Sequence, residues 1–166
     1  MSGVRTRAVS PEEWQLWRDM RLRSLREVPA AFVSTHDHEV LFDEETWRSR
    51  LDGTSGPAVV AHVDEQPVGM GAGRIQRPGR LEVVAMWTDP DWRGHGVGPK
   101  VLDHVVSWAR DRGLQPDLRV ADDNLAARRV YEQYGFRAEG ESAPVREGSE
   151  VTMTRLVLPE EQLRSA

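Results

Sequence analysis

The chain of 166 residues contains no cysteine and only one lysine, Lys100. Without thiols, disulfides, thiolate metal sites and cysteine nucleophiles are all excluded. Together with the lack of a signal-peptide pattern, this composition predicts a reducing, cytoplasmic location. No apolar run approaches the ~20 residues that a membrane-spanning helix needs, so we expect no transmembrane role.

Positive charge is also in the minority, because 22 Lys and Arg residues stand against 27 Asp and Glu residues, for a formal net charge of −5. Nonspecific nucleic-acid affinity comes from clustered positive charge, so neither nucleic acid nor a membrane is an expected partner. The acidic balance suits a cationic partner, although whole-chain charge is a weak guide to one cleft. Length and the lack of repeats or long linkers predict a single domain over residues 1–166.

The hydrophobic period changes type several times along the chain and predicts a mixed α/β fold. Ser10, Pro11 and Glu13 form a helix-start pattern, and that helix should end before Pro29. Glycine after residues 101–112 and after residues 124–134 predicts the ends of two further helices. The predicted strands are 4–9, 58–63, 68–75, 81–88, 118–121, 136–140 and 151–157, and the predicted helices are 10–28, 43–51, a helix that Gly113 ends, and 124–134.

A glycine-rich turn, residues 89–98, joins a predicted strand to a predicted helix. Glycines let backbone N–H groups converge on one point, and a helix N-terminus adds a positive dipole end, so a phosphate or pyrophosphate could bind there. The turn is not a Walker A loop, and Lys100 and Val101 stand where G-x-G-x-x-G needs its last glycine. A tight turn that serves packing alone is the alternative.

Two motifs occur in order on either side of a predicted strand. Residues 93–98 match Q/R-x-x-G-x-G/A, and residues 124–136 match N-x-x-A-x-x-x-Y-x-x-x-G-F. Together they resemble the GNAT superfamily of N-acetyltransferases, closely over residues 81–136 and in element order over nearly the whole chain. The resemblance implies a GNAT fold, an α/β (α+β) arrangement with a mixed, mostly antiparallel sheet and helices on both faces.

The resemblance further implies acetyl-CoA as cosubstrate and direct transfer of its acetyl group to a primary amine in a ternary complex. A V-shaped opening between strands 81–88 and 118–121 would admit the pantetheine arm. By position, the residues that would contact the cofactor are Met86, Trp87, Thr88, Arg93, Gly94, His95, Gly96, Val97, Gly98, Pro99, Asn124 and Ala127. Pro99 removes one N–H from the pyrophosphate cradle, and Lys100 could compensate from the side. A solvated surface lysine is the alternative for Lys100.

Tyr131 is the candidate acid. It lies seven residues after Asn124, on the same helix face, with the small Ala127 between them. In the family that the chain resembles, this tyrosine protonates the departing CoA thiolate. The alternative is a tyrosine that packs in the core.

Glu82 is the candidate base, because it precedes Arg93 by eleven residues, as the base does in protein-lysine acetyltransferases of the family. A solvent-facing glutamate at a strand end is the alternative. A subgroup that resembles ribosomal-protein N-terminal acetyltransferases carries a glutamate where this chain has Arg119. A water chain through Glu82, or through Asp37 or Glu39, would then have to substitute.

The acceptor could be a small-molecule amine or a protein amine. Residues 20–47, including 29–32, resemble the acceptor-side region of small bacterial relatives. Within them, His36, Asp37 and His38 suggest a polar loop more than a metal site, and we expect no metal. A homodimer is expected from the resemblance alone. A noncatalytic acyl-CoA sensor is the alternative function, against which Tyr131 and Glu82 argue.

Overall fold

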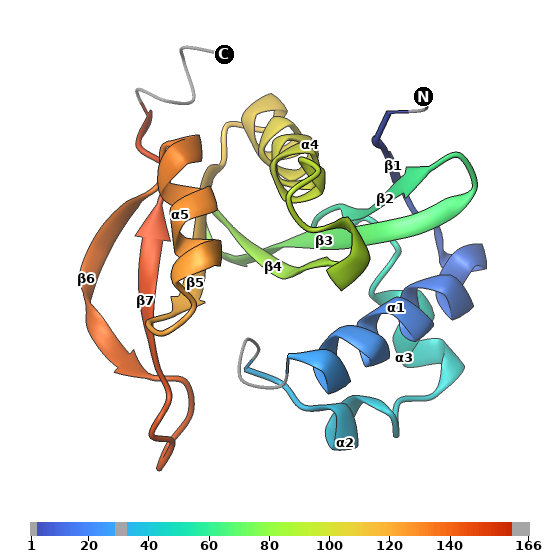
Figure 1. Ribbon diagram of the computed structural model, residues 1–166, viewed down its shortest axis with the longest axis horizontal. Helices are drawn as coiled ribbons and strands as arrows, with labels where there is room; N and C mark the ends of the chain where they lie inside the picture. Colours follow the sequence, from blue (N-terminus) through green and yellow to red (C-terminus); the bar gives the residue numbers. More distant parts are fainter. Residues whose placement is uncertain (1–2, 29–32, 161–166) are drawn as a thin grey trace.

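The computed structural model describes residues 3–28 and 33–160, and a seven-stranded sheet forms its centre (Figure 1). The strand order is β1-β2-β3-β4-β5-β7-β6, and every neighbouring pair is antiparallel except β4 and β5. The strands are β1 (Arg5–Ala8), β2 (Ala58–Val63), β3 (Gln66–Arg77), β4 (Arg80–Thr88), β5 (Gln115–Ala121), β6 (Arg137–Pro144) and β7 (Thr152–Val157). The predicted mixed, mostly antiparallel sheet is confirmed.

Helices cover both faces of the sheet, as the sequence predicts. On one face lie α4 (Val97–Asp111) and α5 (Leu125–Tyr134), and on the other lie α1 (Trp14–Glu27) and α3 (Glu44–Ser49) (Figure 1). The short helix α2 (His36–Glu39) lies next to α1 (Figure 1). None of the helices in the described ranges combines the length and the apolar character needed to cross a bilayer.

The start of the first helix follows the capping pattern. Ser10 and Glu13 form a capping box, and a turn of 3-10 helix, Pro11–Glu13, precedes α1. The helix ends at Glu27, in keeping with the predicted end before Pro29, which itself lies outside the described residues. The prediction of a polar loop at residues 36–38 is wrong, because these residues form the first part of α2.

Each face of the sheet has its own apolar core. The residues that α4 buries against the sheet are Val97, Val101, Leu102, Val105, Val106 and Ala109. On the opposite face, Trp17, Trp47, Met70 and Trp87 belong to a second buried cluster. Burial of a large apolar side chain stabilises the fold by roughly 1.5–3 kcal/mol, so both layers hold the sheet in place.

Candidate active site

Strands β4 and β5 part in the middle of the sheet. Their parallel pairing runs from Arg80 opposite Gln115 to Val83 opposite Leu118. Beyond this point β4 continues beside β3, to Thr88 opposite Gly69, whereas β5 continues beside β7. The strands therefore open toward their carboxyl ends, in the place where the sequence predicts a V-shaped opening.

A β-bulge in β4 accompanies this divergence. Ala85 and Met86 together face Gly71 of β3, and Ala85 has a φ of +58°. A bulge bends its strand, which accounts for the departure of β4 from β5. An added Cβ at Gly71 would lie 2.5 Å from Met86 Sδ and 2.6 Å from Val101 Cγ1, so only glycine lets the bulge pack against α4.

The glycine-rich turn ends as the N-terminus of α4. Gly94 and Gly96 have φ values of +81° and +78°, and Gly96 is the N-cap of the helix. An added Cβ would meet nothing within 4 Å at either residue, and at Gly98 only Thr88 Oγ1 at 4.0 Å. Because the first amides of a helix have no intrahelical acceptor, this open space fits an anionic group such as a diphosphate.

Other side chains of this turn have partners within the protein. Arg93 forms an ion pair of 2.9 Å with Glu27 of α1, and His95 Nδ1 lies 3.1 Å from the carbonyl oxygen of Arg93. The side chain of Val97 is buried in the core, so only its backbone could reach a diphosphate.

Pro99 and Lys100 line a separate, shallow depression beside β1. The ammonium group of Lys100 donates a hydrogen bond of 2.9 Å to the carbonyl oxygen of Val4. In this structure the ammonium group thus binds the segment that precedes β1, and the expectation that Lys100 compensates for the amide missing at Pro99 stays a prediction.

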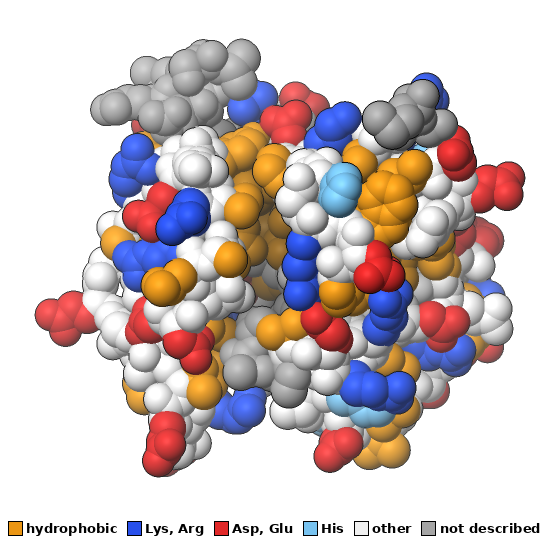
Figure 2. Space-filling view, in the orientation of Figure 1, with side chains coloured by type: hydrophobic (Ala, Val, Ile, Leu, Met, Phe, Trp, Pro, Cys, Tyr) orange, Lys and Arg blue, Asp and Glu red, His pale blue; other side chains and the backbone are white. Residues whose placement is uncertain are grey.

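A cavity of about 540 Å³ lies beside the opening, and its lining includes residues 118–121 of β5 and 82–86 of β4. Figure 2 shows a furrow between α4 and α5 with hydrophobic side chains on its floor. Asn124, Ala127 and Tyr131 all line this cavity. The three residues that were predicted to share one helix face therefore lie on one wall. The side-chain oxygen of Asn124 accepts a hydrogen bond of 3.2 Å from the Ala127 amide and caps α5.

Tyr131 is partly buried among apolar groups, with its ring centroid 6.2 Å from that of Phe136. Burial raises the pKa of its hydroxyl to about 12, so the group is protonated at neutral pH. A protonated hydroxyl at a cavity wall can donate a proton to an anion that develops there.

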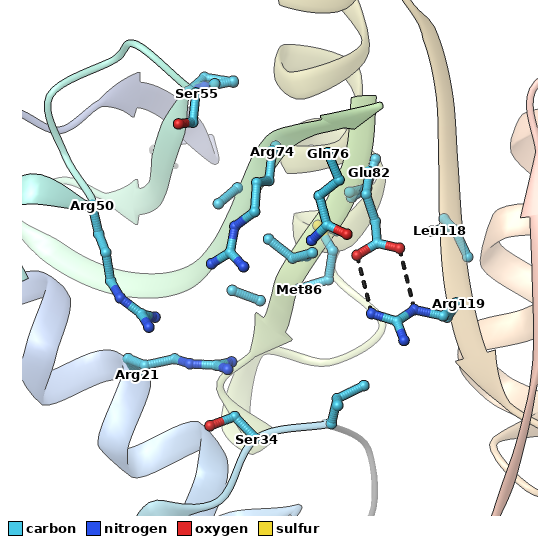
Figure 3. A pocket seen from close by; sticks show the side chains of 18 of the residues that line it. Arg21, Ser34, Arg50, Ser55, Arg74, Gln76, Glu82, Met86, Leu118 and Arg119 are labelled. Atoms are coloured by element: carbon cyan, nitrogen blue, oxygen red, sulfur yellow. Dashed lines mark hydrogen bonds and ion pairs between the residues drawn. The ribbon is translucent and has the colours of Figure 1, made fainter. Parts of the chain in front are cut away.

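Glu82 also lines the cavity, and only 4% of the residue is exposed. Its carboxylate accepts two hydrogen bonds of 3.1 Å from Arg119 (Figure 3). It also accepts one hydrogen bond of 3.1 Å from Arg155. The solvent-facing alternative is thus wrong for this residue. Since three N–H donors already occupy the carboxylate, Glu82 could receive a proton from an amine only beside these guanidinium groups or through water.

Trp87 and Asp37 lie apart from the cavity lining. Trp87 is buried in the opposite core and its Nε1 donates a hydrogen bond of 2.9 Å to Glu27, so only its backbone could contact a ligand in the opening. The side chain of Asp37 is fully exposed. Among residues 3–28 and 33–160, no group of three or more His, Asp or Glu side chains could hold a metal ion.

The far wall of the cavity comes from residues that the motifs did not single out. Arg21 of α1, Arg50 at the end of α3 and Arg74 of β3 point into one space, together with Gln76 (Figure 3). Arg21 had a sequence signal, because it interrupts the apolar stripe between Trp17 and Leu25. The other three had none, since an arginine or glutamine at a strand or helix end is ordinary.

Glu39 lies between two of these arginines and is fully buried. Arg21 donates hydrogen bonds of 3.1 and 2.9 Å to its carboxylate, and Arg50 lies at 3.6 Å. Burial alone would raise the pKa of Glu39, but the bonds from Arg21 and the charge of Arg50 outweigh it and hold the pKa below its usual value. The carboxylate is therefore a fixed anion within the acceptor side.

Comparison with known proteins agrees with the geometry of this site. The model of the Acetyltransferase (GNAT) family matches residues 14–136. Among curated proteins, the L-amino acid N-acetyltransferase of Escherichia coli is 32% identical over 104 residues, which are 58% of this chain and 64% of that protein. The chain spans between 37% and 64% of the length of the curated relatives that it matches.

Solved structures share the fold at low identity. A putative acetyltransferase from Salmonella typhimurium with its cofactor acetyl-CoA has a TM-score of 0.76 and 18% identity, with 95% of this chain and 94% of that chain covered. Spermidine N-acetyltransferase from Vibrio cholerae, in complex with CoA and spermine, has a TM-score of 0.77 and 16% identity, with 97% and 98% covered. A glycine-capped helix, a parted sheet and a family match over residues 14–136 together show that this chain belongs to the GNAT family of acetyltransferases.

Proposed function

We propose that this protein transfers an acetyl group from acetyl-CoA to a primary amine by direct attack of the amine on the thioester. The observation that carries the proposal is the parting of β4 and β5 beside a cavity lined by Tyr131 and Glu82, in a chain of this family. Bound acetyl-CoA would supply the thioester. The amides of residues 94–98, without Pro99, would hold its diphosphate.

The remaining cofactor contacts follow from the opening. The backbones of Met86, Trp87 and Thr88 would bind the pantetheine arm as an added strand would, because residues 84–88 of β4 have left β5. A backbone N–H of this bulged segment would polarise the thioester carbonyl. Asn124 and Ala127 would form the opposite wall.

Two side chains would move the protons. An alkylamine has a pKa of ~10.4 and must lose a proton before it attacks. Glu82 would receive this proton through a water molecule beside Arg119. Tyr131 would give its proton to the departing thiolate. Because the conjugate acid of the thiolate has an ordinary pKa of ~8.5, below the pKa of about 12 of Tyr131, this transfer depends on the geometry and desolvation of the thiolate in the cavity.

An assay of thiol release with purified protein, acetyl-CoA and a panel of primary amines tests the proposal. Amine-dependent release of one thiol per acetylated product is the expected result. Calorimetry with acetyl-CoA distinguishes the enzyme from the alternative function, a noncatalytic acyl-CoA sensor. Such a sensor would bind acetyl-CoA but release no thiol. A protein that fails to bind acetyl-CoA would contradict both readings.

Three expectations from the sequence stay predictions. They are the single domain over residues 1–166, the cytoplasmic location and the homodimer. Length and the lack of repeats support the single domain, the lack of cysteine and of a signal-peptide pattern supports the location, and the resemblance supports the homodimer. Size-exclusion chromatography with light scattering tests the dimer.

A further inference from the structure

The acceptor side of the cavity carries more positive than negative charge. Arg21, Arg50 and Arg74 converge there (Figure 3), and Glu39 is the buried carboxylate between the first two. Asp52 is a second carboxylate of the lining, and it accepts hydrogen bonds of 2.9 and 2.7 Å from the neutral backbone amide and hydroxyl of Thr54. Within the described ranges, Arg74 has neither a hydrogen bond nor an ion pair. Three arginines against the carboxylates of Glu39 and Asp52 leave this wall with close to one unbalanced positive charge.

The guanidinium of Arg50 is positioned before any ligand binds. It stacks over the ring of Phe42, with its carbon 4.5 Å from the ring centroid, and lies 5.9 Å from that of Trp47. Burial lowers the pKa of Arg50 below its usual value, and the charges of Arg74 and Arg21 act in the same direction while Glu39 opposes them. Arg50 and Arg74 line the same cavity (Figure 3), so their like charges repel each other and an anion between them would relieve this repulsion.

The charge of this wall decides between classes of acceptor. A polyamine would bring more positive charge to three arginines, which is unfavourable. A planar carboxylate matches the donor geometry of guanidinium groups, and charge-assisted bonds of this kind are about twice as strong as neutral ones. One unbalanced charge suits a monoanion better than a phosphate dianion. The acidic net charge of the chain pointed to a cationic acceptor, but the local charges of the cavity point the other way.

We propose that the acceptor is a small amine that carries a carboxylate, as amino acids do, and that Arg50 and Arg74 bind the carboxylate. This proposal rests on the proposed acetyl transfer and names its acceptor class. The cavity of about 540 Å³ includes the wall formed by Tyr131, and its volume is in the range of sites that bind small molecules, so a single amino acid fits beside a thioester. The carboxylate end would lie on the arginines and the amine end toward Met86 and Glu82.

Matched acceptor pairs test the proposal. Each L-amino acid is compared with the amine that its decarboxylation gives, such as leucine with 3-methylbutylamine and phenylalanine with phenethylamine, and spermine and phosphoethanolamine are included. We expect kcat/KM to be about tenfold or more higher for the amino acid of at least one pair. Preference for the decarboxylated amine, spermine or phosphoethanolamine overturns the carboxylate site and leaves acetyl transfer intact.

Variants locate the effect. Arg74→Gln and Arg50→Gln should raise KM for the amino acid about tenfold or more and leave KM for its decarboxylated partner unchanged. Arg77→Gln is the matched control for Arg74, because Arg77 lies three residues along the same strand and binds Asp117 at 3.1 Å outside the cavity. Arg48→Gln is the control for Arg50, because Arg48 binds Glu44 at 2.8 Å on the surface of α3. Equal losses in variant and control overturn the assignment.

A binding measurement keeps the proposal testable if no amine in the panel is acetylated. Calorimetry in the presence of CoA compares N-acetyl-L-leucine with N-acetyl-3-methylbutylamine. Tighter binding of the carboxylate compound, lost in Arg74→Gln and kept in Arg77→Gln, supports the site. Equal or undetectable binding of both compounds overturns it, and the separate titration with acetyl-CoA reports on the proposed function.

Discussion

At the scale of single residues, Tyr131 combines an apolar setting with a hydroxyl group that has no hydrogen-bond partner in the described part of the chain. Tyr134, three residues on, donates a hydrogen bond of 2.9 Å to Asp103 and lines the shallow depression beside β1. The two tyrosines of the protein thus have distinct surroundings, and only the first lies on the wall of the cavity.

Replacement of Tyr131 by phenylalanine should lower kcat about 10²-fold and leave the affinity for acetyl-CoA unchanged. The ring still fills its place, whereas the proton that the thiolate needs is gone. Tyr134→Phe is the control and should keep its kcat. Steady-state kinetics with the best amine of the panel measure both variants, and an unchanged kcat in Tyr131→Phe refutes the role of acid.

Glu82 could act as the base or could only position two arginines, since it forms ion pairs with Arg119 and Arg155. If it receives the proton of the amine, Glu82→Gln should lower kcat about 10²-fold near pH 7, and the loss should shrink as the pH rises toward the pKa of the amine. The reason is that an amine already deprotonated in solution needs no base. A loss of equal size from pH 7 to pH 10 would mean that Glu82 only positions the arginines.

The same scale shows what the sequence could predict. Asn124, Ala127 and Tyr131 reach one wall because a single helix sets their spacing, so their arrangement follows from periodicity. Arg50 and Arg74 come from different elements, and only the packing of α3 against the sheet brings them together. Spacing along the chain contains no information on such a pair.

At the scale of elements, the prediction of strands and helices succeeded where periodicity was long. Residues 58–63 form β2 with the predicted bounds, and α5 ends before Gly135 as predicted. Helix α2 was missed because four residues show no period; it depends on Thr35, whose hydroxyl accepts a hydrogen bond of 3.2 Å from the His38 amide. The parting of β4 and β5 depends on pairing, which the family resemblance supplied and the hydrophobic pattern did not.

The N-terminus of α4 is tested by one pair of glycine variants. Gly96→Val and Gly79→Val both place a side chain at nearly the same positive φ, +78° and +77°, with nothing within 4 Å. Both should lose about 1–2 kcal/mol of the free energy of unfolding, measured with urea.

Only Gly96→Val should also weaken acetyl-CoA binding, by about 100-fold in calorimetry, because its side chain fills the space above the helix N-terminus. A matching loss of affinity in Gly79→Val, or normal affinity in Gly96→Val, would show that the diphosphate binds elsewhere.

At the scale of the whole molecule, ion pairs join the two parts of the sheet where β4 and β5 are still paired. Asp117 of β5 binds Arg77 of β3, Arg80 of β4 and Arg155 of β7 at 3.1, 2.8 and 3.1 Å. Arg80 also forms an ion pair of 2.8 Å with Glu139 of β6. These pairs keep β4 and β5 together below the point at which they part.

Stability should fall in acid for a related reason. Arg21 and Arg50 hold the pKa of Glu39 below its ordinary 4.5, and Arg80 does the same for Glu139. A carboxylate with a lowered pKa in the folded state stabilises the fold above its unfolded pKa, and this contribution is lost as the pH falls through the folded pKa. The free energy of unfolding should therefore be nearly level from pH 6 to pH 8 and decrease below about pH 4.5.

Urea denaturation across this range measures the effect, with Glu39→Gln as the control. The variant should be about 3 kcal/mol less stable at pH 7, because it leaves Arg21 buried with a weaker partner, and the difference should narrow in acid. A protein whose stability increases on acidification from pH 6 to pH 4 would contradict this assignment.

The central claim is that acetyl-CoA lies in the opening between β4 and β5, with its diphosphate at the N-terminus of α4. A crystal structure of the protein with acetyl-CoA tests it most directly. We predict diphosphate oxygens within hydrogen-bond distance of amides in residues 94–98 and the pantetheine arm along residues 84–88, with the thioester near Tyr131. A cofactor that lies on another surface, or a complex in which these amides contact no phosphate oxygen, would contradict the account.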